Sequence, residues 1–465
     1  MAKVLISFLG TGRIKKDTPF KKDTPSREYE PTKYHSSREY EKTTYRIDDV
    51  DYDCTFVSIA LRKHFDIDTL ILIGTTHSMW EDVYREYTQP QTVYNIWDEI
   101  GKTCDKNNYK SELTIPHKEK IEAAMGKGSQ AILVKYGINA EEIQQNSEII
   151  LGLEKSLKKG DELYVDITHS FRSLPLYIMN LLVYLRDVSS KKIKISGIYY
   201  GMLEATRDLG YTPIVDLSDV LNVSSWISGA YSFMEFGNAY KIASLIDNVG
   251  IIEPKRFSEP LRGFTDAKNL NHLAELENQI QRLQVLHNTN DLPHIARMVI
   301  DPVVKDFLSS VKMGSGKYKH SDFQYKLAIW QKRNHNYAAA YISLNEAILT
   351  RACEFCKLDS GNFDHREYTK VAFRWARGRS GAQSAKAKLK EANLLEHFRP
   401  YYIDLKDYDS LYNKVANNRN AIAHNLRDQN GRATNSVANM ICELDTFLDQ
   451  YKTIYNANQS IKSSI

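Results

Sequence analysis

The sequence predicts a doubly wound, mostly parallel α/β sheet in its first half and an all-α second half. Two observations carry this prediction. Short apolar runs rich in Val, Ile and Leu alternate with amphipathic runs up to about residue 222, as strands and helices do in a parallel sheet. Beyond that point the strand-like runs fade and the remaining segments have helical period. Because the two halves differ in class, we expect separate domains joined by a helical connector.

Five apolar runs indicate buried strands, since the strands of a parallel sheet are covered on both faces. They span residues 3–10, 69–76, 131–137, 162–170 and 193–201. Helices are predicted between them at 56–65, 139–160 and 171–188. The second of these helices begins at Asn139, with Glu142 three residues on as in a capping box. This alternation gives the first half a Rossmann-like layout.

One polar segment, residues 14–50, interrupts the alternation after the first strand. It repeats KKDTP at 15–19 and 21–25, and SREYE at 26–30 and 37–41. Aliphatic residues that could form a core are scarce in it. We interpret the segment as an inserted surface loop or β-hairpin, and a dedicated binding element is the alternative.

The second half carries six runs with helical period. They span residues 221–246, 267–288, 293–311, 320–334, 337–358 and 435–455. A break rich in Gly and Ser at 313–319 indicates a linker or loop between the third and the fourth run. These runs predict a helical connector followed by a C-terminal helical domain.

Composition narrows the class of protein. The 465 residues are 42% hydrophobic and 26% charged, which suits two or three ordinary domains. The formal net charge is only +4, so contact with nucleic acid depends on local placement of basic residues. Because no apolar run approaches the roughly 18 residues of a membrane span, we expect a cytoplasmic protein.

Cysteine usage indicates a reduced compartment, since the five cysteines are odd in number and scattered. Cys353 and Cys356 form one CxxC within a helical run, with no second pair or nearby His. A zinc site would need such partners. We therefore interpret the two as small buried residues and expect neither a metal nor a cofactor.

Small and polar residues follow four of the predicted strands, where open α/β sheets bind ligands. The residues concerned are Gly10, Thr11, Gly12, Thr75, Thr168, His169, Ser170, Arg172 and Gly201. Glycines let backbone N–H groups approach an anion, and the helix after residue 170 offers its first N–H groups to a phosphate. No GxGxxG or GxxxxGK[ST] motif occurs. We favour a phosphate- or nucleotide-like ligand, with turns that bind nothing as the alternative.

Near the C-terminus, residues 419–424 read RNAIAH. Asn420 and His424 are four residues apart and so share one face of a helix. The run looks like the start of a helix, whose free N–H groups would face an anion. The same Arg-x4-His spacing recurs at Arg282 and His287, and about one chance match is expected in a chain of this length. Spacing alone therefore decides nothing.

The chemistry of these residue types suits RNA cleavage without metal, in which the 2′-OH attacks the adjacent phosphorus. Histidine can relay protons near neutral pH. The planar guanidinium of Arg419 can stabilise charge on phosphate oxygens, and Asn420 can orient the phosphate or His424. One Arg and one His make a thin site, so we expect two chains to complete it across a two-fold interface.

RNAIAH in an all-α C-terminal domain resembles the R-x4-H motif of HEPN ribonucleases. FLGTG at the first strand, GTTHSMW and DITHSFRSLP resemble the CARF sensor domains of CRISPR-associated proteins. In this order the pair resembles the Csx-type CARF–HEPN ribonucleases that accompany type III CRISPR systems. The resemblance implies a CARF domain over 1–222, a helical linker domain over 223–320 and a HEPN domain over 321–465.

The resemblance also implies a mechanism. Homodimers, or assemblies of dimers, bind a cyclic oligoadenylate in their CARF domains, with cyclic tetra-adenylate as the first candidate, and then cut single-stranded RNA without metal. Arg419 and His424 would be catalytic and Asn420 supporting. The ligand pocket would be lined by Thr11, Gly12, Thr168, His169, Ser170 and Arg172. Some members also degrade their activator in that pocket.

Two alternatives remain open from the sequence. One is a non-enzymatic sensor whose α domain only dimerises or binds a partner, with RNAIAH as a capped helix. The other is a ligand-responsive transcription regulator, which would need a basic recognition helix. The basic runs 330–336 and 373–390 are candidates for such a helix, although solvated faces or RNA-backbone contacts are the favoured interpretation.

Overall fold

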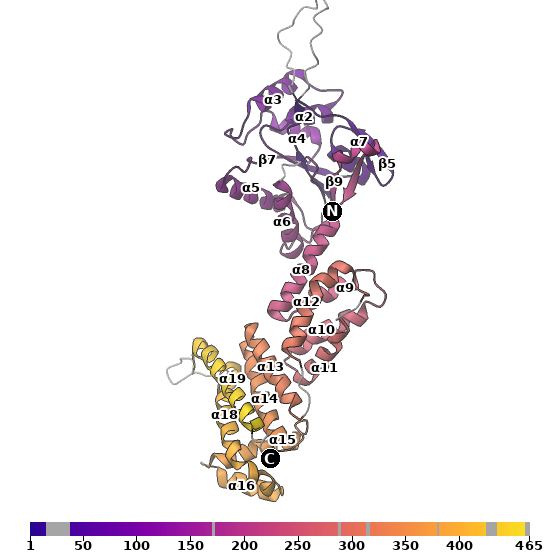
Figure 1. Ribbon diagram of the computed structural model, residues 1–465. Helices are drawn as coiled ribbons and strands as arrows, with labels where there is room; N and C mark the ends of the chain where they lie inside the picture. Colours follow the sequence, from indigo (N-terminus) through magenta and orange to yellow (C-terminus); the bar gives the residue numbers. More distant parts are fainter. Residues whose placement is uncertain are drawn as a thin grey trace, which may run out of the picture. The chain divides into compact units, whose positions relative to one another are not determined.

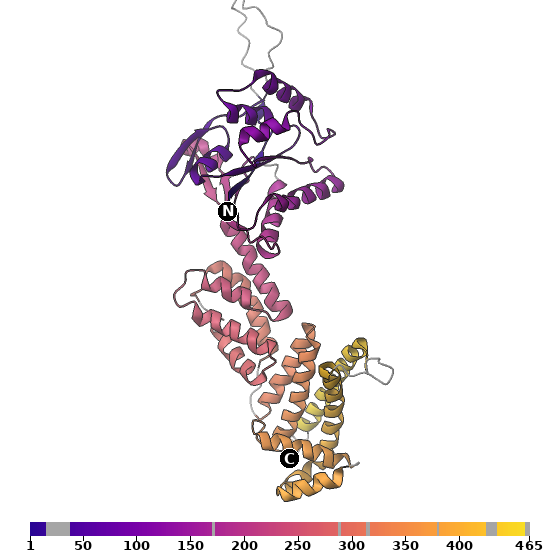
Figure 2. The same ribbon diagram turned by 180° about the vertical axis from the view of Figure 1, so that it is seen from behind.

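The structure of the protein is a computed structural model, shown from two sides in Figures 1 and 2. It describes residues 1–14, 38–169, 173–286, 290–312, 317–378, 381–424 and 435–460. The chain divides into two compact units, Met1–Ser224 and Ser225–Ile465. The boundary falls within helix α8, Ser218–Phe236. The finer division at residues 222 and 320 stays a prediction.

Within its described residues, the first unit is built on an eight-stranded sheet in the order β5-β4-β10-β9-β8-β1-β6-β7. The strands are β1 Lys3–Leu9, β4 Thr43–Ile47, β5 Val50–Cys54, β6 Thr69–Gly74, β7 Gln130–Leu133, β8 Glu162–Asp166, β9 Lys194–Gly201 and β10 Thr212–Asp216. Strands β9, β8, β1, β6 and β7 are parallel to one another. Strand β10 is antiparallel to β9, and β4 and β5 extend the sheet beyond it. The predicted α/β sheet is confirmed.

Helices cover both faces of this sheet. One core includes α1 Val57–Phe65, α2 Trp80–Thr88, α3 Tyr94–Lys106 and α4 Lys118–Met125, and the other includes α5 Ala140–Gly152 and α6 Leu174–Asp187. Strand β1 shows the cause, because its side chains alternate between the faces. Leu5 and Leu9 enter the first core, and Val4, Ile6 and Phe8 enter the second. Burial on both sides is why the strand reads as a continuous apolar run.

The elements of the first unit differ from the prediction at several points, and strands β4, β5 and β10 were not predicted. The helix expected over 139–160 ends at Gly152 and continues as the 3-10 helix Leu153–Ser156. Helices α2, α3 and α4 between β6 and β7 were not predicted as elements. Within the 14–50 segment, residues 15–37 lie outside the described residues. The two-residue strands β2 Arg13–Ile14 and β3 Arg38–Glu39 pair there in antiparallel fashion, ahead of β4.

The second unit is helical throughout its described residues, as predicted. After α8 come α9 Tyr240–Asp247, α10 Lys255–Asn269, α11 Leu273–Leu283, α12 His294–Ser310, α13 Lys319–Arg333, α14 Tyr337–Phe355, α15 Phe363–Arg377, α16 Ala382–Glu391, α17 Leu395–Phe398, α18 Tyr402–His424 and α19 Val437–Ser460. No helix in the described ranges is long and apolar enough to cross a membrane.

Two hydrophobic cores hold these helices. The first includes aromatic rings of α8, α10 and α12, in which Phe264 and Phe307 meet edge to face with centroids 5.0 Å apart. The second gathers α14, α15, α18 and α19 and contains both cysteines of the CxxC pair. Cys353 and Cys356 are fully buried, and burial raises the pKa of each thiol. Their interpretation as buried packing residues is confirmed.

Candidate functional site

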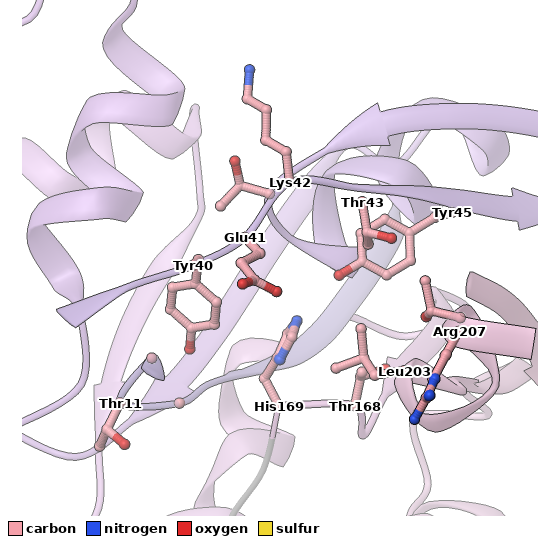
Figure 3. Close-up of a pocket in the computed structure, with 14 residues that line it drawn as sticks. Thr11, Tyr40, Glu41, Lys42, Thr43, Tyr45, Thr168, His169, Leu203 and Arg207 are labelled. Atoms are coloured by element: carbon pink, nitrogen blue, oxygen red, sulfur yellow. The ribbon is translucent and has the colours of Figure 1, made fainter. Parts of the chain in front are cut away.

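A cavity of about 620 Å³ lies at the carboxyl ends of β1 and β8 (Figure 3). The predicted residues Gly10, Thr11, Gly12, Thr168 and His169 all line it. The cavity thus brings together predicted residues from the turns after β1 and β8. The volume of the cavity falls within the usual range of small-molecule sites.

The turn after β8 is fixed by a buried carboxylate, Asp166. Ser7 Oγ donates a hydrogen bond to one Asp166 oxygen at 2.6 Å. The N–H and the hydroxyl of Thr168 donate to the other oxygen at 2.9 and 2.6 Å. The hydroxyl oxygen of Thr168 in turn accepts the Gly201 N–H at 2.8 Å. Asp166 thus ties β1, β8 and β9 together beneath the cavity.

The interior of the cavity is uncharged at His169 and Tyr40. Burial lowers the pKa of His169 against the opposing effect of Asp166, so its imidazole is neutral near pH 7. Burial raises the pKa of Tyr40, which keeps its hydroxyl protonated. The two rings meet edge to face with centroids 5.3 Å apart. His169 Nε2 is buried and has no hydrogen-bond partner among the described atoms, so its hydrogen-bonding capacity is unused within them.

Several lining residues were not predicted as site residues. Tyr40, Glu41, Lys42, Thr43 and Tyr45 come from the end of the 14–50 segment, and Leu203, Thr206 and Arg207 follow β9. Residues 40–43 and 45 of the segment, which was interpreted as an inserted surface loop or β-hairpin, therefore also form part of the cavity wall. Lys42, Arg207 and Glu41 are exposed, so the rim carries charges of both signs. The feature of the sequence that could have pointed to these lining residues was the second SREYE copy, which contains Tyr40 and Glu41.

The other predicted ligand residues lie elsewhere. Thr75 is fully buried outside the cavity lining, and its N–H donates to Ser78 Oγ at 2.9 Å. Gly201 is also outside the lining and contributes through its bond to Thr168. Ser170 and Arg172 lie outside the described residues. Their contact with ligand stays a prediction.

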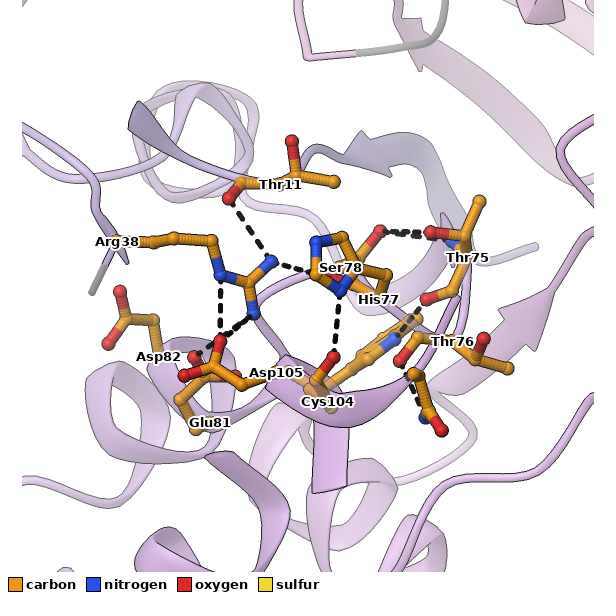
Figure 4. Close-up of polar contacts among 12 residues, drawn as sticks. Thr11, Arg38, Thr75, Thr76, His77, Ser78, Glu81, Asp82, Cys104 and Asp105 are labelled. Carbon is orange, nitrogen blue, oxygen red and sulfur yellow. Dashed lines mark hydrogen bonds and ion pairs between the residues drawn. The ribbon is translucent and has the colours of Figure 1, made fainter. Parts of the chain in front are cut away.

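Behind the Gly10–Gly12 loop lies a buried cluster of charged residues centred on Arg38 (Figure 4). The guanidinium of Arg38 donates to Asp105 Oδ1 through Nε at 2.9 Å and to the carbonyl oxygens of Thr11 and His77 through Nη1 at 3.3 and 2.5 Å. Glu81 Oε1 lies 4.0 Å from Nη2 and is fully buried. The cluster joins the first loop to α2 and α3.

Glu81 gives this unit a pH-dependent stability. Burial, helped by the neighbouring Asp82 and opposed by Arg38, raises the pKa of Glu81 to about 7. Because the folded-state pKa lies above the unfolded one, folding favours the protonated form, and the unfolding free energy falls as pH rises through about 4.5 to 7. We expect Glu81→Gln to stabilise the protein at pH 8 by on the order of 1–3 kcal/mol and to have little effect at pH 4.5. Thermal melts across this pH range measure the difference.

The matched control is Glu141→Gln on the exposed face of α5, which removes one carboxylate without touching the cluster. Its melting curve should follow that of the original protein at every pH. The contradicting outcome is a change in unfolding free energy on Glu81→Gln that is the same at pH 8 as at pH 4.5. It would show that ionising Glu81 in the folded protein costs little.

The second candidate site is the end of helix α18. Arg419, Asn420 and His424 lie in its last two turns, so the expectation that a helix begins there is wrong. The reason is a buried stripe at Tyr408 and Leu411 that carries the helical period through. A helix end presents carbonyl oxygens and favours a cation, so an anion at this point must be held by side chains.

Arg419 is half-buried on this helix. Its Nε is buried without a hydrogen-bond partner in the part of the chain that the structure describes. The side chain lies close enough to the Tyr412 hydroxyl, about two turns before it, to lower the pKa that burial raises there. Asn420 and His424 keep the i,i+4 relation that places them on one helical face. Nothing is described of the His424 side chain.

The residue before Arg419 anchors the helix end. Asn418 is buried and its amide donates to Tyr341 Oη at 2.9 Å and to Glu443 Oε2 at 2.7 Å. Asn435, which follows the undescribed residues 425–434, also donates to Glu443 Oε2, at 2.9 Å. Helices α14, α18 and α19 therefore share one buried polar network beside the predicted catalytic residues. No group of three His, Cys, Asp or Glu side chains suited to a metal ion occurs among the described residues.

The sheet with its ligand-sized cavity at the strand ends defines a Rossmann-like ligand-binding domain, followed by an all-α region. Comparison with known proteins makes this specific. Residues 4–204 match the family described as CRISPR system endoribonuclease Csx1, CARF domain. Residues 222–317 match the family described as CRISPR-associated protein MJ1674, second domain. Residues 4–204 therefore form a CARF domain of the kind found in CRISPR-associated proteins.

A curated relative is the CRISPR-associated protein MJ1674 of Methanocaldococcus jannaschii. It is 33% identical over 377 residues, which cover 77% of this chain and 55% of that protein. The match thus spans about half the length of that relative. Among solved structures, the chain is similar to Enterococcus italicus Csm6 bound to cyclic hexa-2'-fluoro-hexa-dAMP, at 12% identity over 100% of both chains. The TM-score of 0.37 is too low for this likeness to carry an argument.

Proposed function

We propose that this protein is a metal-independent endoribonuclease that cuts single-stranded RNA when a cyclic oligoadenylate binds its CARF domain. The observation that carries the proposal is the cavity at the strand ends of a CARF domain, with a neutral His169 inside and with Lys42, Arg207 and Glu41 among its lining residues. The RNAIAH run in a helical C-terminal region supports the second half of the proposal. The setting would be type III CRISPR antiviral defence.

The cavity chemistry suits a nucleotide ligand. An adenine edge or a ribose hydroxyl both donates and accepts hydrogen bonds, as the neutral imidazole of His169 and the hydroxyls of Tyr40 and Thr168 do. Phosphates prefer cations and backbone N–H groups, which Arg207 and the Gly10–Gly12 loop provide. Because one cavity has the size of a small-molecule site, a ring of four or more nucleotides requires a second chain. Cyclic tetra-adenylate is our first candidate.

At the other end, Arg419 and His424 supply the groups that metal-free cleavage needs. His424 relays the proton between the attacking 2′-OH and the leaving 5′-oxygen. Arg419 stabilises the negative charge on the phosphorane oxygens, and Asn420 orients the phosphate or the imidazole. Two chains related by a two-fold axis bring two such sets to one cleft, which makes the site composite. The ligand acts by binding one arrangement of the dimer more tightly than the other.

The test is a cleavage assay on a fluorescent single-stranded RNA in EDTA, with and without cyclic tetra- or hexa-adenylate. Linear oligoadenylate is the matched ligand control. We expect one ring size to raise the cleavage rate by about 10–100-fold and the linear control to leave it unchanged. Tight ring binding without any cleavage would leave a non-enzymatic sensor. Absence of binding to any ring would overturn the proposal for the CARF cavity.

A further inference from the structure

The Gly10–Gly12 loop of the cavity is held from behind by residues that return from the 14–50 segment. Strand β3 pairs with β2, which directly follows the loop, with Ile14 opposite Arg38. From this position the buried guanidinium of Arg38 turns back and donates to the carbonyl oxygen of Thr11 at 3.3 Å (Figure 4). The same nitrogen donates to the His77 carbonyl at 2.5 Å. One side chain therefore fixes the direction of the loop backbone.

The rest of the guanidinium is anchored to helix α3. Nε and Nη2 of Arg38 lie 2.9 and 2.6 Å from the carboxylate of Asp105, near the end of that helix. A buried ion pair is weak evidence for added stability, because desolvation offsets much of the attraction. What the planar fork provides is geometry, since it binds a carboxylate and two carbonyls at fixed angles.

Tyr40, two residues further on, contacts the same loop from the cavity side. Its hydroxyl lies against Gly10. A Cβ at Gly10 would come within 2.9 Å of that hydroxyl and 3.2 Å of the His169 carbonyl oxygen, so only glycine fits. Gly12 has a φ of 69°, which glycine adopts without strain. The loop is thus held on both sides.

We propose that Arg38 and Tyr40 are positioning residues that preset the Gly10–Gly12 loop for its ligand. Arg38 donates a hydrogen bond to the carbonyl oxygen of Thr11. Tyr40 packs against Gly10 and so fixes the position of the loop relative to the turn after β8. When the loop is already ordered before binding, no entropy is lost in ordering it on binding. Arg38 therefore raises the affinity for the ligand although it does not contact the ligand itself. This proposal rests on the proposed function for the identity of the ligand.

The experiment measures two quantities in the full-length protein: the Kd of cyclic tetra-adenylate by calorimetry, and hydrogen–deuterium exchange of the loop amides without ligand. We expect Arg38→Ala to weaken binding by about 10–100-fold and to speed exchange at Thr11 and Gly12. Arg38→Lys keeps the charge but not the fork, so it should recover only part of the affinity. Tyr40→Phe should weaken binding by a smaller factor, about fivefold.

Two controls separate positioning from general damage. Arg46→Ala removes an arginine with an exposed ion pair on β4, and Ile100→Val mildly destabilises α3 in its buried core. Both should keep the original Kd and loop exchange. If the Arg38→Ala protein keeps the original Kd and the original exchange rate of the loop amides, Arg38 does not position the loop. If the original protein binds no cyclic oligoadenylate, the proposed function fails, while the exchange data still decide whether Arg38 orders the loop.

Discussion

Arg419→Ala and His424→Ala are each expected to abolish activator-dependent RNA cleavage while leaving the Kd for cyclic oligoadenylate unchanged. General acid–base catalysis by a histidine is worth about 10²–10⁴-fold in rate. Loss of a cation that stabilises charge in the transition state costs about 10²–10³-fold. Both residues lie in the last two turns of α18, in the second unit, whereas the cavity belongs to the first. Single-turnover cleavage and calorimetry on the same preparations measure the two effects.

The chain provides a matched control for these variants in its other Arg-x4-His pair. Arg282 is exposed on α11, a helix that packs in a different core from α18, and it donates to Gln279 at 3.3 Å. Arg282→Ala should cleave at the original rate. Asn420→Ala should give an intermediate loss, because asparagine only orients groups. Full activity in His424→Ala would remove the proposed proton relay and leave the helical region as a dimerisation or partner-binding element.

The sheet could be predicted from the sequence because its signal is local. The consecutive residues Leu5 and Ile6 are both apolar because they face opposite sides of the sheet, each of which is covered by helices. A continuous apolar run therefore marks the strand. Gly10 and Gly12 were also found from local pattern, since two glycines directly after a buried strand are typical of a loop whose backbone approaches a ligand. The turn at Thr168 followed in the same way from its place after β8.

The wall formed by residues 40–45 could not be found this way because its signal is not local. Tyr45 reaches the cavity because β4 pairs with β10, where it lies opposite Thr212 in the ladder. That pairing joins residues more than 160 positions apart, and neither strand reads as a buried apolar run. The role of Arg38 could not be predicted for a related reason. A charged residue in a polar repeat gives no sign that it will be buried in an ion pair with Asp105.

The end of α18 shows a local signal that was overruled by another. Asn417, Asn418 and Asn420 are residue types that favour helix caps. The spacing of Leu405, Tyr408, Leu411 and Val415 instead places one buried stripe along the helix, and Asn418 continues it. Asn418 is buried because Tyr341 and Glu443 satisfy its amide, so the period overrides the cap preference.

Asp166→Asn is expected to cost the CARF domain its ligand, with a rise in the Kd of cyclic oligoadenylate of about 100-fold. The substitution keeps the size of the side chain but removes the charge that accepts three hydrogen bonds from Ser7 and Thr168. Hydrogen bonds to a charged group are worth about 1.5–3 kcal/mol each, so Thr168 and the turn to His169 should shift when the charge is lost. Calorimetry measures the Kd, and thermal melts measure the accompanying loss of stability.

A second aspartate in the same unit makes this prediction sharp. Asp216, at the end of β10, accepts the N–H and the hydroxyl of Ser218 at 2.8 and 2.5 Å, in the same local arrangement as Asp166 and Thr168. Asp216 does not line the cavity. Asp216→Asn therefore breaks an equivalent turn at a strand end without disturbing the ligand, and its Kd should equal that of the original protein. Equal losses of affinity in the two variants would mean that the strand-end turns affect binding only through the stability of the sheet, and the cavity at β1 and β8 would lose its special role.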